Sequence, residues 1–306
     1  MQVEIKKKKI DWKKYIFVGS VLAYPLALFL LMYVYVNINS FVMAFQSSNI
    51  DGSKIFVGFN NFKDFISRIT EDGGLLRVSL INSLKMYIIN FAICMPLYIF
   101  FSYLLFKHVF AEKFLRVLIM VPQVLSGMIV ALLFKKFIDN AFPDIMKNIF
   151  NLQSFPLLLT EKQYAFGTTL FYMIWISFGT NVIVYSNAMN GIDPEIIESA
   201  KIDGIDNMFL ELWHIILPLI YPTLTTFIVT GFASILTNGG VIMTFYYNAS
   251  PSYLYNMGYY YSVQIINGNT ATYNMLAAGG LIMTLLVAPA TNLLKYLMEK
   301  YGPGVE

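Results

Sequence analysis

Six long apolar stretches divide the chain, and shorter polar segments separate them. A membrane-spanning helix needs about 20 mostly apolar residues, and each stretch reaches that length. The pattern is clearest from Leu212 to Leu294, where no Asp, Glu, Lys or Arg occurs. We therefore expect six membrane helices, at Tyr15–Val36, Met86–Phe106, Val117–Phe134, Ala165–Asn187, His214–Leu236 and Tyr273–Lys295.

Lysine and arginine residues near the helix ends orient the chain, because positive charge favours the cytoplasmic side of a membrane. They gather in the N-terminal segment, in the link between the second and third helices, and at the C-terminus, as Lys6, Lys7, Lys8, Lys9, Lys13, Lys14, Lys107, Lys113, Arg116, Lys295 and Lys300. We take this side as cytoplasmic. The chain then divides into a cytoplasmic segment 1–14, a first membrane helix 15–36, an extracytoplasmic segment 37–85, a core of five membrane helices 86–300 and a cytoplasmic tail 301–306.

The composition agrees with this reading. Hydrophobic residues make up 57% of the chain and charged residues 13%, whereas soluble domains carry about 25% charged residues. The net charge of +3 is spread along the chain and indicates no nucleic-acid partner. The single cysteine, Cys94, excludes an intrachain disulfide, and no cluster of Cys and His suggests a metal. The sequence predicts an all-α polytopic protein of the lipid bilayer.

A short segment between the fourth and fifth spans predicts a helix at 193–204. Asp193 is a good N-cap, and Pro194 suits the first helical position. Gly204 is well placed to end the helix with a positive φ. Glu198 and Lys201 lie one turn apart and can pair.

This predicted helix has a narrow apolar face, formed by Ile196, Ile197 and Ala200, that is too small to span a membrane. The face must pack either on the spans of the same chain or on another protein. A helix that lies at the membrane interface is the alternative, although such helices carry a basic polar face that this segment lacks.

The residues of this loop resemble a known motif. Glu198-Ser-Ala200, Gly204 and then Ile215-Ile-Leu-Pro218 resemble the Glu-Ala-Ala loop of ATP-binding-cassette (ABC) importer permeases, in particular the maltose-type, carbohydrate-uptake branch. Ser199 replaces the usual second small alanine, and the spacing from Gly204 to Pro218 is one residue longer than the family pattern. Three other segments also resemble that family, namely Val57–Phe62, Leu115–Pro122 and Trp175–Gly179.

The resemblance implies the fold of a type I ABC importer permease and a short coupling helix that inserts into a cleft on a separate ATPase. The residues implied in this contact are Glu198, Ser199, Ala200, Asp203 and Gly204. It also implies a second, related permease, two copies of the ATPase and an extracytoplasmic solute-binding protein. The chain contains no phosphate-binding loop, so it is not expected to be an enzyme or to hold a cofactor, and ATP and Mg would reside on the ATPase.

The spans that flank the loop carry neutral polar residues, which suit a hydroxylated ligand such as a sugar or oligosaccharide. In the maltose-type permeases the sugar-contacting positions lie in these two spans, and they fall here on Ile176, Ser177, Thr180, Thr230, Ala233, Ser234 and Thr237. Hydrogen bonding between helices is an alternative role for the hydroxyls. Whether this chain or its partner permease holds the sugar stays open, and a polyol or a glycerol phosphodiester is the alternative cargo.

Two other classes of protein fit less well. An ion-driven secondary transporter usually needs carboxylates within its spans, and these spans lack them. A membrane enzyme needs convergent catalytic groups such as a buried His with an acid, whereas His214 lies at the cytoplasmic start of a span. The tyrosine-rich segment after the fifth span predicts an aromatic belt at the membrane interface or a contact with the solute-binding protein.

Overall fold

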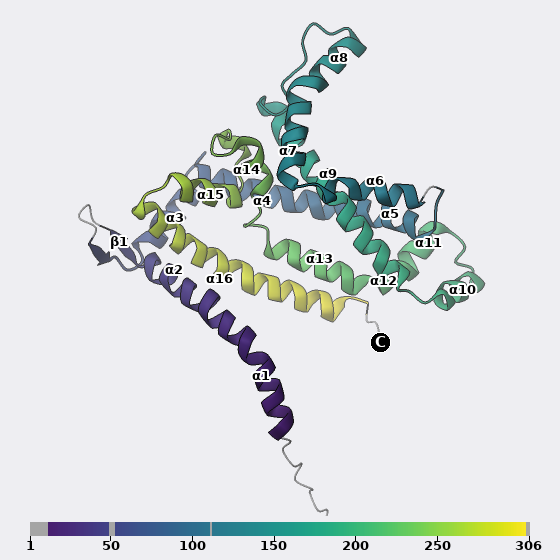
Figure 1. The fold of residues 1–306 in the computed structure, drawn as a ribbon, viewed down its shortest axis with the longest axis horizontal. Coiled ribbons are helices and arrows are strands. Elements are labelled where there is room, and N and C mark those ends of the chain that lie inside the picture. Colours follow the sequence, from purple (N-terminus) through teal and green to yellow (C-terminus); the bar gives the residue numbers. More distant parts are fainter. Residues whose placement is uncertain (1–11, 49–52, 111, 304–306) are drawn as a thin grey trace, which may run out of the picture. The chain divides into compact units, whose positions relative to one another are not determined.

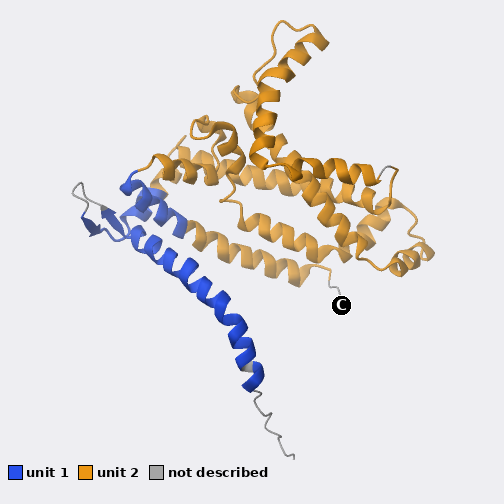
Figure 2. Cartoon of the chain, viewed as in Figure 1, with its two compact units in different colours: residues 1–65, 269–281 blue, residues 66–268, 282–306 orange. Residues whose placement is uncertain are grey.

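The computed structural model describes residues 12–48, 53–110 and 112–303. The predicted lysine cluster Lys6–Lys9 and the end of the tail, 304–306, lie outside the described residues. The chain forms two compact units, one of residues 1–65 with 269–281 and one of residues 66–268 with 282–306 (Figure 2).

The described residues contain four helices that are long and apolar enough to cross a membrane, at Trp12–Ala44, Leu75–Phe106, Lys162–Asn190 and Thr270–Tyr301. Two further candidates are bent pairs of helices, Glu112–Val124 with Gly127–Phe150 and Met208–Leu219 with Tyr221–Ala233. If each bent pair is one span, the count reaches the six that the hydrophobic pattern predicts.

The first unit begins with one long helix, drawn in purple in Figure 1, that comprises α1 (Trp12–Leu28), the π-helical η1 (Phe29–Tyr35) and α2 (Val36–Ala44). A small antiparallel hairpin follows, β1 (Gln46–Ser48) and β2 (Lys54–Phe56). Helix α3 (Asn60–Thr70) starts in this unit, and so does α16 (Thr270–Tyr301). The hairpin is a small exception to the all-α prediction.

The segment Val57–Phe62, which resembles a family motif, holds the end of the first span. The rings of Phe59 and Phe62 pack on Phe45, with centroids at 5.5 and 5.0 Å. The Asn61 amide donates to the carbonyls of Ala44 and Gln46, at 2.9 and 2.8 Å. Asn61 thus bonds a free carbonyl at the end of α2 and the first residue of β1, so the motif fixes the end of the first apolar helix.

The second unit holds the other elements. They are α4 (Leu75–Ile89), η2 (Asn90–Cys94), α5 (Met95–Phe106), α6 (Glu112–Val124), α7 (Gly127–Lys136), η3 (Phe137–Ala141), α8 (Phe142–Phe150), α9 (Lys162–Asn190), α10 (Pro194–Ile202), α11 (Met208–Glu211), η4 (Leu212–Ile216), α12 (Leu217–Leu219), α13 (Tyr221–Ala233), α14 (Gly240–Tyr246), η5 (Ser252–Leu254) and α15 (Met257–Asn267). Its main core joins α5, α9 and the start of the fifth span through Tyr103, Tyr185, Met189, Ile216 and Ile220.

The candidates for the third and fifth spans are bent pairs of helices. The third turns by 96° between Val124 and Gly127, where Ser126 adopts an extended ψ of 125°. The fifth turns by 70° at Ile220. Pro222 follows that bend directly, and in a straight helix its ring would collide with the carbonyl four residues earlier. The break therefore falls where proline forbids a continuous helix.

The tyrosine-rich segment after the fifth span is a packed part of the fold rather than an exposed belt. Tyr255, Tyr259 and Tyr260 are buried. The hydroxyls of Tyr246 and Tyr253 donate to the carbonyls of Leu159 and Thr160, at 2.5 and 2.9 Å. These bonds join α14 and η5 to the segment before α9. The five tyrosines named here are therefore buried or hydrogen-bonded within the chain.

Candidate functional site

The loop between α9 and α13 contains the predicted short helix, as α10. At its start the Asp193 carboxylate accepts a hydrogen bond from the amide of Glu195 at 3.1 Å, and Pro194 occupies the first turn. This is the side-chain cap that the sequence predicts. The helix therefore has a fixed beginning directly after the membrane helix α9.

Helix α10 ends in a left-handed turn at Gly204, where φ is +90°. The amide of Ile205 donates to the Ala200 carbonyl at 3.0 Å, and the amide of Gly204 donates to the Lys201 carbonyl at 3.1 Å. This pair of bonds is the Schellman arrangement, which requires a positive φ at the glycine position. Any side chain at Gly204 would strain the backbone, although the space around it is open.

One part of the apolar face of α10 packs on this chain, and the other part is exposed. Ala200 is buried, and Ile197 packs against the main core. Ile202 is 87% exposed and Ile196 is 42% exposed. Part of the face thus packs on the spans of this chain, and the rest is uncovered.

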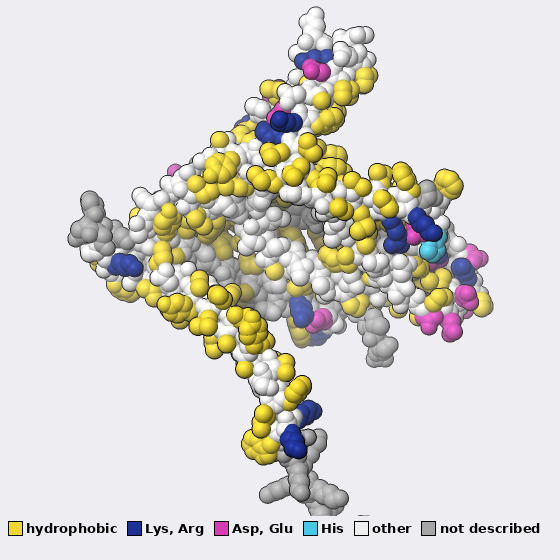
Figure 3. Space-filling model, in the orientation of Figure 1, with side chains coloured by type: hydrophobic (Ala, Val, Ile, Leu, Met, Phe, Trp, Pro, Cys, Tyr) yellow, Lys and Arg dark blue, Asp and Glu magenta, His cyan; other side chains and the backbone are white. Residues whose placement is uncertain are grey.

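The polar residues of α10 lie outside the core. Glu198, Ser199 and Asp203 are exposed, and acidic side chains gather at this end of the molecule (Figure 3). The expected Glu198–Lys201 pair is not formed, and within the described part of the chain Glu198 has no ion-pair partner. An exposed pair of this spacing contributes only a few tenths of a kcal/mol, which explains why the two side chains stay apart.

The chain leaves α10 through a second capped turn. The Asn207 side chain accepts a hydrogen bond from the amide of Phe209 at 2.8 Å and starts α11. The following turn, Leu212–Ile216, is π-helical. A π turn bonds residues five apart and so holds one more residue than an α turn. This π turn lies between Gly204 and Pro218, the stretch that is one residue longer than the pattern it resembles.

A buried ion pair fixes this exit to a distant part of the chain. The Lys107 ammonium, at the end of α5, lies 2.5 Å from one oxygen of Glu211 and 2.7 Å from the other. The Glu211 side chain is only 5% exposed, and that of Lys107 is 28% exposed. The ammonium also lies over the rings of Tyr103 and Phe106. The two opposite charges therefore compensate each other in a site that is mostly shielded from water.

A second cluster of charges joins α6 to α9 at the same end. Glu112 accepts a hydrogen bond from Arg116 at 2.7 Å, and His108 lies 2.7 Å from its other oxygen. Arg116 also donates to the hydroxyl of Ser186, at 3.1 Å. We call Lys107, Glu112, Arg116, Ser186 and Glu211 the anchor, because these five residues join α5 to α11 and α6 to α9.

Close packing of α6 on α9 continues from the anchor into the membrane region. A Cβ at Gly179 would overlap the backbone carbonyl of Ile119, so only glycine permits the two helices to approach this far. Phe178 packs on Tyr98 and Phe101, and Thr180 donates to Gln123 at 2.6 Å. The two motifs Leu115–Pro122 and Trp175–Gly179 therefore form one helix–helix seam.

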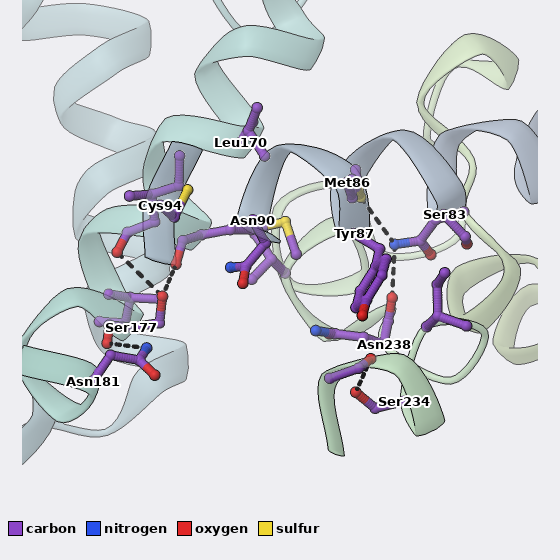
Figure 4. Close-up of a pocket in the computed structure, with 17 residues that line it drawn as sticks. Ser83, Met86, Tyr87, Asn90, Cys94, Leu170, Ser177, Asn181, Ser234 and Asn238 are labelled. Atoms are coloured by element: carbon purple, nitrogen blue, oxygen red, sulfur yellow. Dashed lines mark hydrogen bonds between the residues drawn. The ribbon is translucent and has the colours of Figure 1, made fainter. Parts of the chain in front are cut away.

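Further along the spans, a cavity of about 400 Å³ lies between α4, α9 and the segment that follows α13 (Figure 4). Its polar groups are amides and hydroxyls from Ser83, Asn90, Ser177, Asn181, Ser234, Asn238 and Asn256. In Figure 4, Asn90 lies between Ser177 and Asn181 on one side and Tyr87, Ser234 and Asn238 on the other. We call this space the neutral cavity, since its lining holds no charged side chain and no His among the described residues.

The structure brings some of the predicted path residues together. Ile176, Ser177 and Ser234 line the neutral cavity. Thr230 lines a second cavity of about 530 Å³ between α13 and α16. Thr180 is bonded to Gln123, and Ala233 and Thr237 line neither cavity.

The sequence prediction did not name the contribution of the second span, α4 with η2. Ser83, Met86 and Tyr87 of α4 and Asn90 and Cys94 of η2 line the cavity, and these positions recur every three or four residues along one face of the span. Asn90 is the polar residue at the centre of an otherwise apolar run, and a polar side chain there was the available signal. The prediction took its path residues only from the fourth and fifth spans. It therefore did not include the amide group of Asn90, which faces the cavity from the second span.

Comparison with known proteins gives relatives in bacterial transport. Over 292 residues the chain is 27% identical to the polygalacturonan/rhamnogalacturonan transport system permease protein YteP of Bacillus subtilis (strain 168), with 91% of this chain and 88% of that protein covered. It is 24% identical over 185 residues to the multiple sugar-binding transport system permease protein MsmF of Streptococcus mutans serotype c, with 60% of this chain and 61% of that protein covered.

The same fold occurs in a solved structure, a bacterial ABC transporter involved in the import of the acidic polysaccharide alginate. The TM-score is 0.75 at 20% identity, with 93% of this chain and 98% of that chain covered. A family model described as "binding-protein-dependent transport system inner membrane component" matches residues 65–302. This match confirms the resemblance that the loop motif indicated, and the chain belongs to the family of binding-protein-dependent transport system inner membrane components.

Proposed function

We propose that this chain forms half of the membrane path of an ABC importer for sugars or oligosaccharides. The names of its relatives support a saccharide cargo, and the neutral cavity offers the amides and hydroxyls that sugar hydroxyls pair with. A second, related permease forms the other half. A solute-binding protein delivers the cargo from outside, as the family description supports.

Helix α10 is the contact with a separate ATPase, which carries ATP and Mg and is present in two copies. One observation carries this proposal. Ala200 of α10 is buried, whereas Glu198, Ile196 and Ile202 of the same helix remain exposed. The uncovered groups suit a cleft with an apolar floor and a cation for Glu198. The caps fix both ends of α10, and Ile197 packs on the core that joins α5, α9 and the start of the fifth span. We expect a displacement of α10 to act on these spans through that contact.

Through this contact, nucleotide binding changes the side of the membrane to which the path is open. An ATPase that closes on ATP draws two coupling helices together and favours the outward-facing state of the path. Because a ligand shifts a conformational equilibrium only by its differential affinity for the two states, the fit of α10 in the cleft must differ between them. Loss of that fit uncouples ATP hydrolysis from transport and leaves the path intact.

The test uses the assembled transporter in proteoliposomes with the variants Glu198→Lys and Gly204→Leu. We expect each to lower saccharide uptake at least about tenfold, the equivalent of 1.4 kcal/mol of coupling, while the complex still inserts in the membrane. Gly191→Ala is the matched control, because Gly191 has an ordinary φ of −79° and a Cβ there meets no backbone closer than 3.4 Å. Normal uptake and normal ATPase stimulation in both variants would refute this role of α10.

The proposed orientation has its own test, because Cys94 is the single cysteine of the chain. In a Cys94→Ser background, Ser199→Cys places one exposed thiol on α10. A membrane-impermeant maleimide should label it in inside-out vesicles and not in intact cells. Labelling from the outside would reverse the orientation and exclude an ATPase at α10.

A further inference from the structure

The lining of the neutral cavity carries information about the charge of the cargo. Seventeen residues line it, and within this described set none is Lys, Arg, His, Asp or Glu. Lys85 of α4 is close in sequence, but the positions of α4 that line the cavity are 83, 86 and 87, and Lys85 is not among them. Helical spacing directs it to another face of α4.

Several polar groups of the cavity have no partner in the protein. Among the described residues, the side-chain amides of Asn90 and Asn238 make no hydrogen bond. Ser177 and Asn181 bond only along their own helix or, for Ser177, to Tyr98. Ser234 donates to the Gly231 carbonyl at 3.1 Å, which leaves its oxygen free to accept. The cavity therefore presents both donors and acceptors to whatever occupies it.

Amides and hydroxyls match the hydroxyls of a neutral sugar, since each of these groups donates and accepts. The ring of Tyr87 and the side chains of Met86 and Ile174 supply apolar surface for the C–H faces of a pyranose. A carboxylate or a phosphodiester carries a negative charge. Its transfer from water is strongly unfavourable unless a cation or several converging hydrogen-bond donors surround it.

The fold itself does not decide between the two kinds of cargo, because a solved transporter with this fold imports an acidic polysaccharide. We infer that the neutral cavity, as one part of the half-path formed by this chain, selects uncharged saccharides against uronates and phosphodiesters, through Asn90, Asn181, Ser234 and Asn238. This inference rests on the proposed function and deepens it, because it names the substrate class of the same path.

The experiment uses the purified complex of this chain with its partner permease and ATPase, without the solute-binding protein. It is dialysed against two pools of matched chain lengths, neutral oligosaccharides and oligouronates, and the bound sugars are identified by mass spectrometry. We expect the neutral pool to be retained at least about tenfold better. Equal or better retention of the uronates overturns the inference. Retention of neither pool also overturns it, whereas the coupling role of α10 is tested separately by the Glu198 and Gly204 variants.

A charge placed in the cavity shows whether this chain does the selecting. Ser234→Lys should raise the ratio of bound uronate to bound neutral sugar about tenfold relative to Ser234→Met, which has similar length and no charge. If Ser234→Lys does not assemble, Asn238→Lys against Asn238→Met gives the same comparison from the segment after α13. An unchanged ratio in an assembled lysine variant would place the selection in the partner permease and refute the inference.

Discussion

The anchor and the neutral cavity lie in the same unit of the chain and use polar residues in opposite ways. The anchor pairs full charges, with Lys107 2.5 Å from Glu211 and Arg116 2.7 Å from Glu112. The cavity contains only neutral groups, and its amides at Asn90 and Asn238 have no partner within the described chain. The ion pairs of the anchor thus hold its charged groups in place, whereas the two free amides of the cavity remain available to a ligand.

The difference follows from the physical demands on each region. A buried charge that loses its partner is costly, so a paired charge holds two helices in one geometry. A neutral amide exchanges one hydrogen-bond partner for another at little net cost. The anchor therefore suits the transmission of force from α10, and the cavity suits a ligand that enters and leaves. Substitutions in the anchor, in the neutral cavity and in the elements next to them separate these two roles.

The largest effect should come from Glu211→Ala. It leaves the Lys107 ammonium without a partner, and breaking a buried pair costs about 3–5 kcal/mol, less here because Lys107 is partly exposed. The midpoint of thermal unfolding of the complex in detergent should fall clearly. The exchanged pair Lys107→Glu with Glu211→Lys should recover part of the loss. Glu299→Ala, which breaks an exposed pair with Lys295, is the control and should cost under about 1 kcal/mol.

The next largest effect should come from Gly179→Ala in the seam between α6 and α9. Its Cβ collides with the backbone at Ile119, and forced overpacking costs about 1–3 kcal/mol. Gly167→Ala lies on the same helix with nothing within 4 Å of its Cβ and should be neutral or slightly stabilising. Equal unfolding midpoints for the two variants would show that the seam is not tightly packed.

Leucine in the path should change transport more than stability. Ser234→Leu fills the neutral cavity, and Thr230→Leu fills the second cavity beside α16. Each loses a hydroxyl worth about 0.5–1.5 kcal/mol in hydrogen bonding, with steric obstruction added. Uptake should fall while basal ATPase activity survives, because α10 is unchanged. Thr168→Leu, on the exposed side of α9, is the control. Normal uptake in both path variants would place the sugar site in the partner permease.

The smallest effect should come from Lys201→Ala. Since Lys201 makes no ion pair with Glu198 in the described structure, its loss should change the free energy of unfolding by less than about 0.5 kcal/mol. A larger loss of stability would mean that the two side chains pair in the assembled transporter. Thermal unfolding at low and high salt distinguishes these outcomes, because salt screens an exposed pair.

The sequence by itself determined the features that depend on neighbouring residues or on composition. The lengths of the apolar runs indicated six spans, and the described residues contain four long apolar helices and two bent pairs. Asp193, Pro194 and Gly204 predicted both ends of α10, because a cap and a positive φ are local properties of the backbone. The order of the motifs indicated the family for the same reason, since each motif is contiguous in the chain.

Only the tertiary structure decided which distant residues meet. Lys107 and Glu211 are 104 positions apart, and no local pattern pairs them. The packing of α5 on α9 brought Asn90 of the preceding η2 to the same cavity as Ser177 and Asn181, and the fold divided Ser234 from Thr230 between two cavities. Helical spacing gives the face on which a side chain lies, whereas the partner of that face depends on how the helices pack.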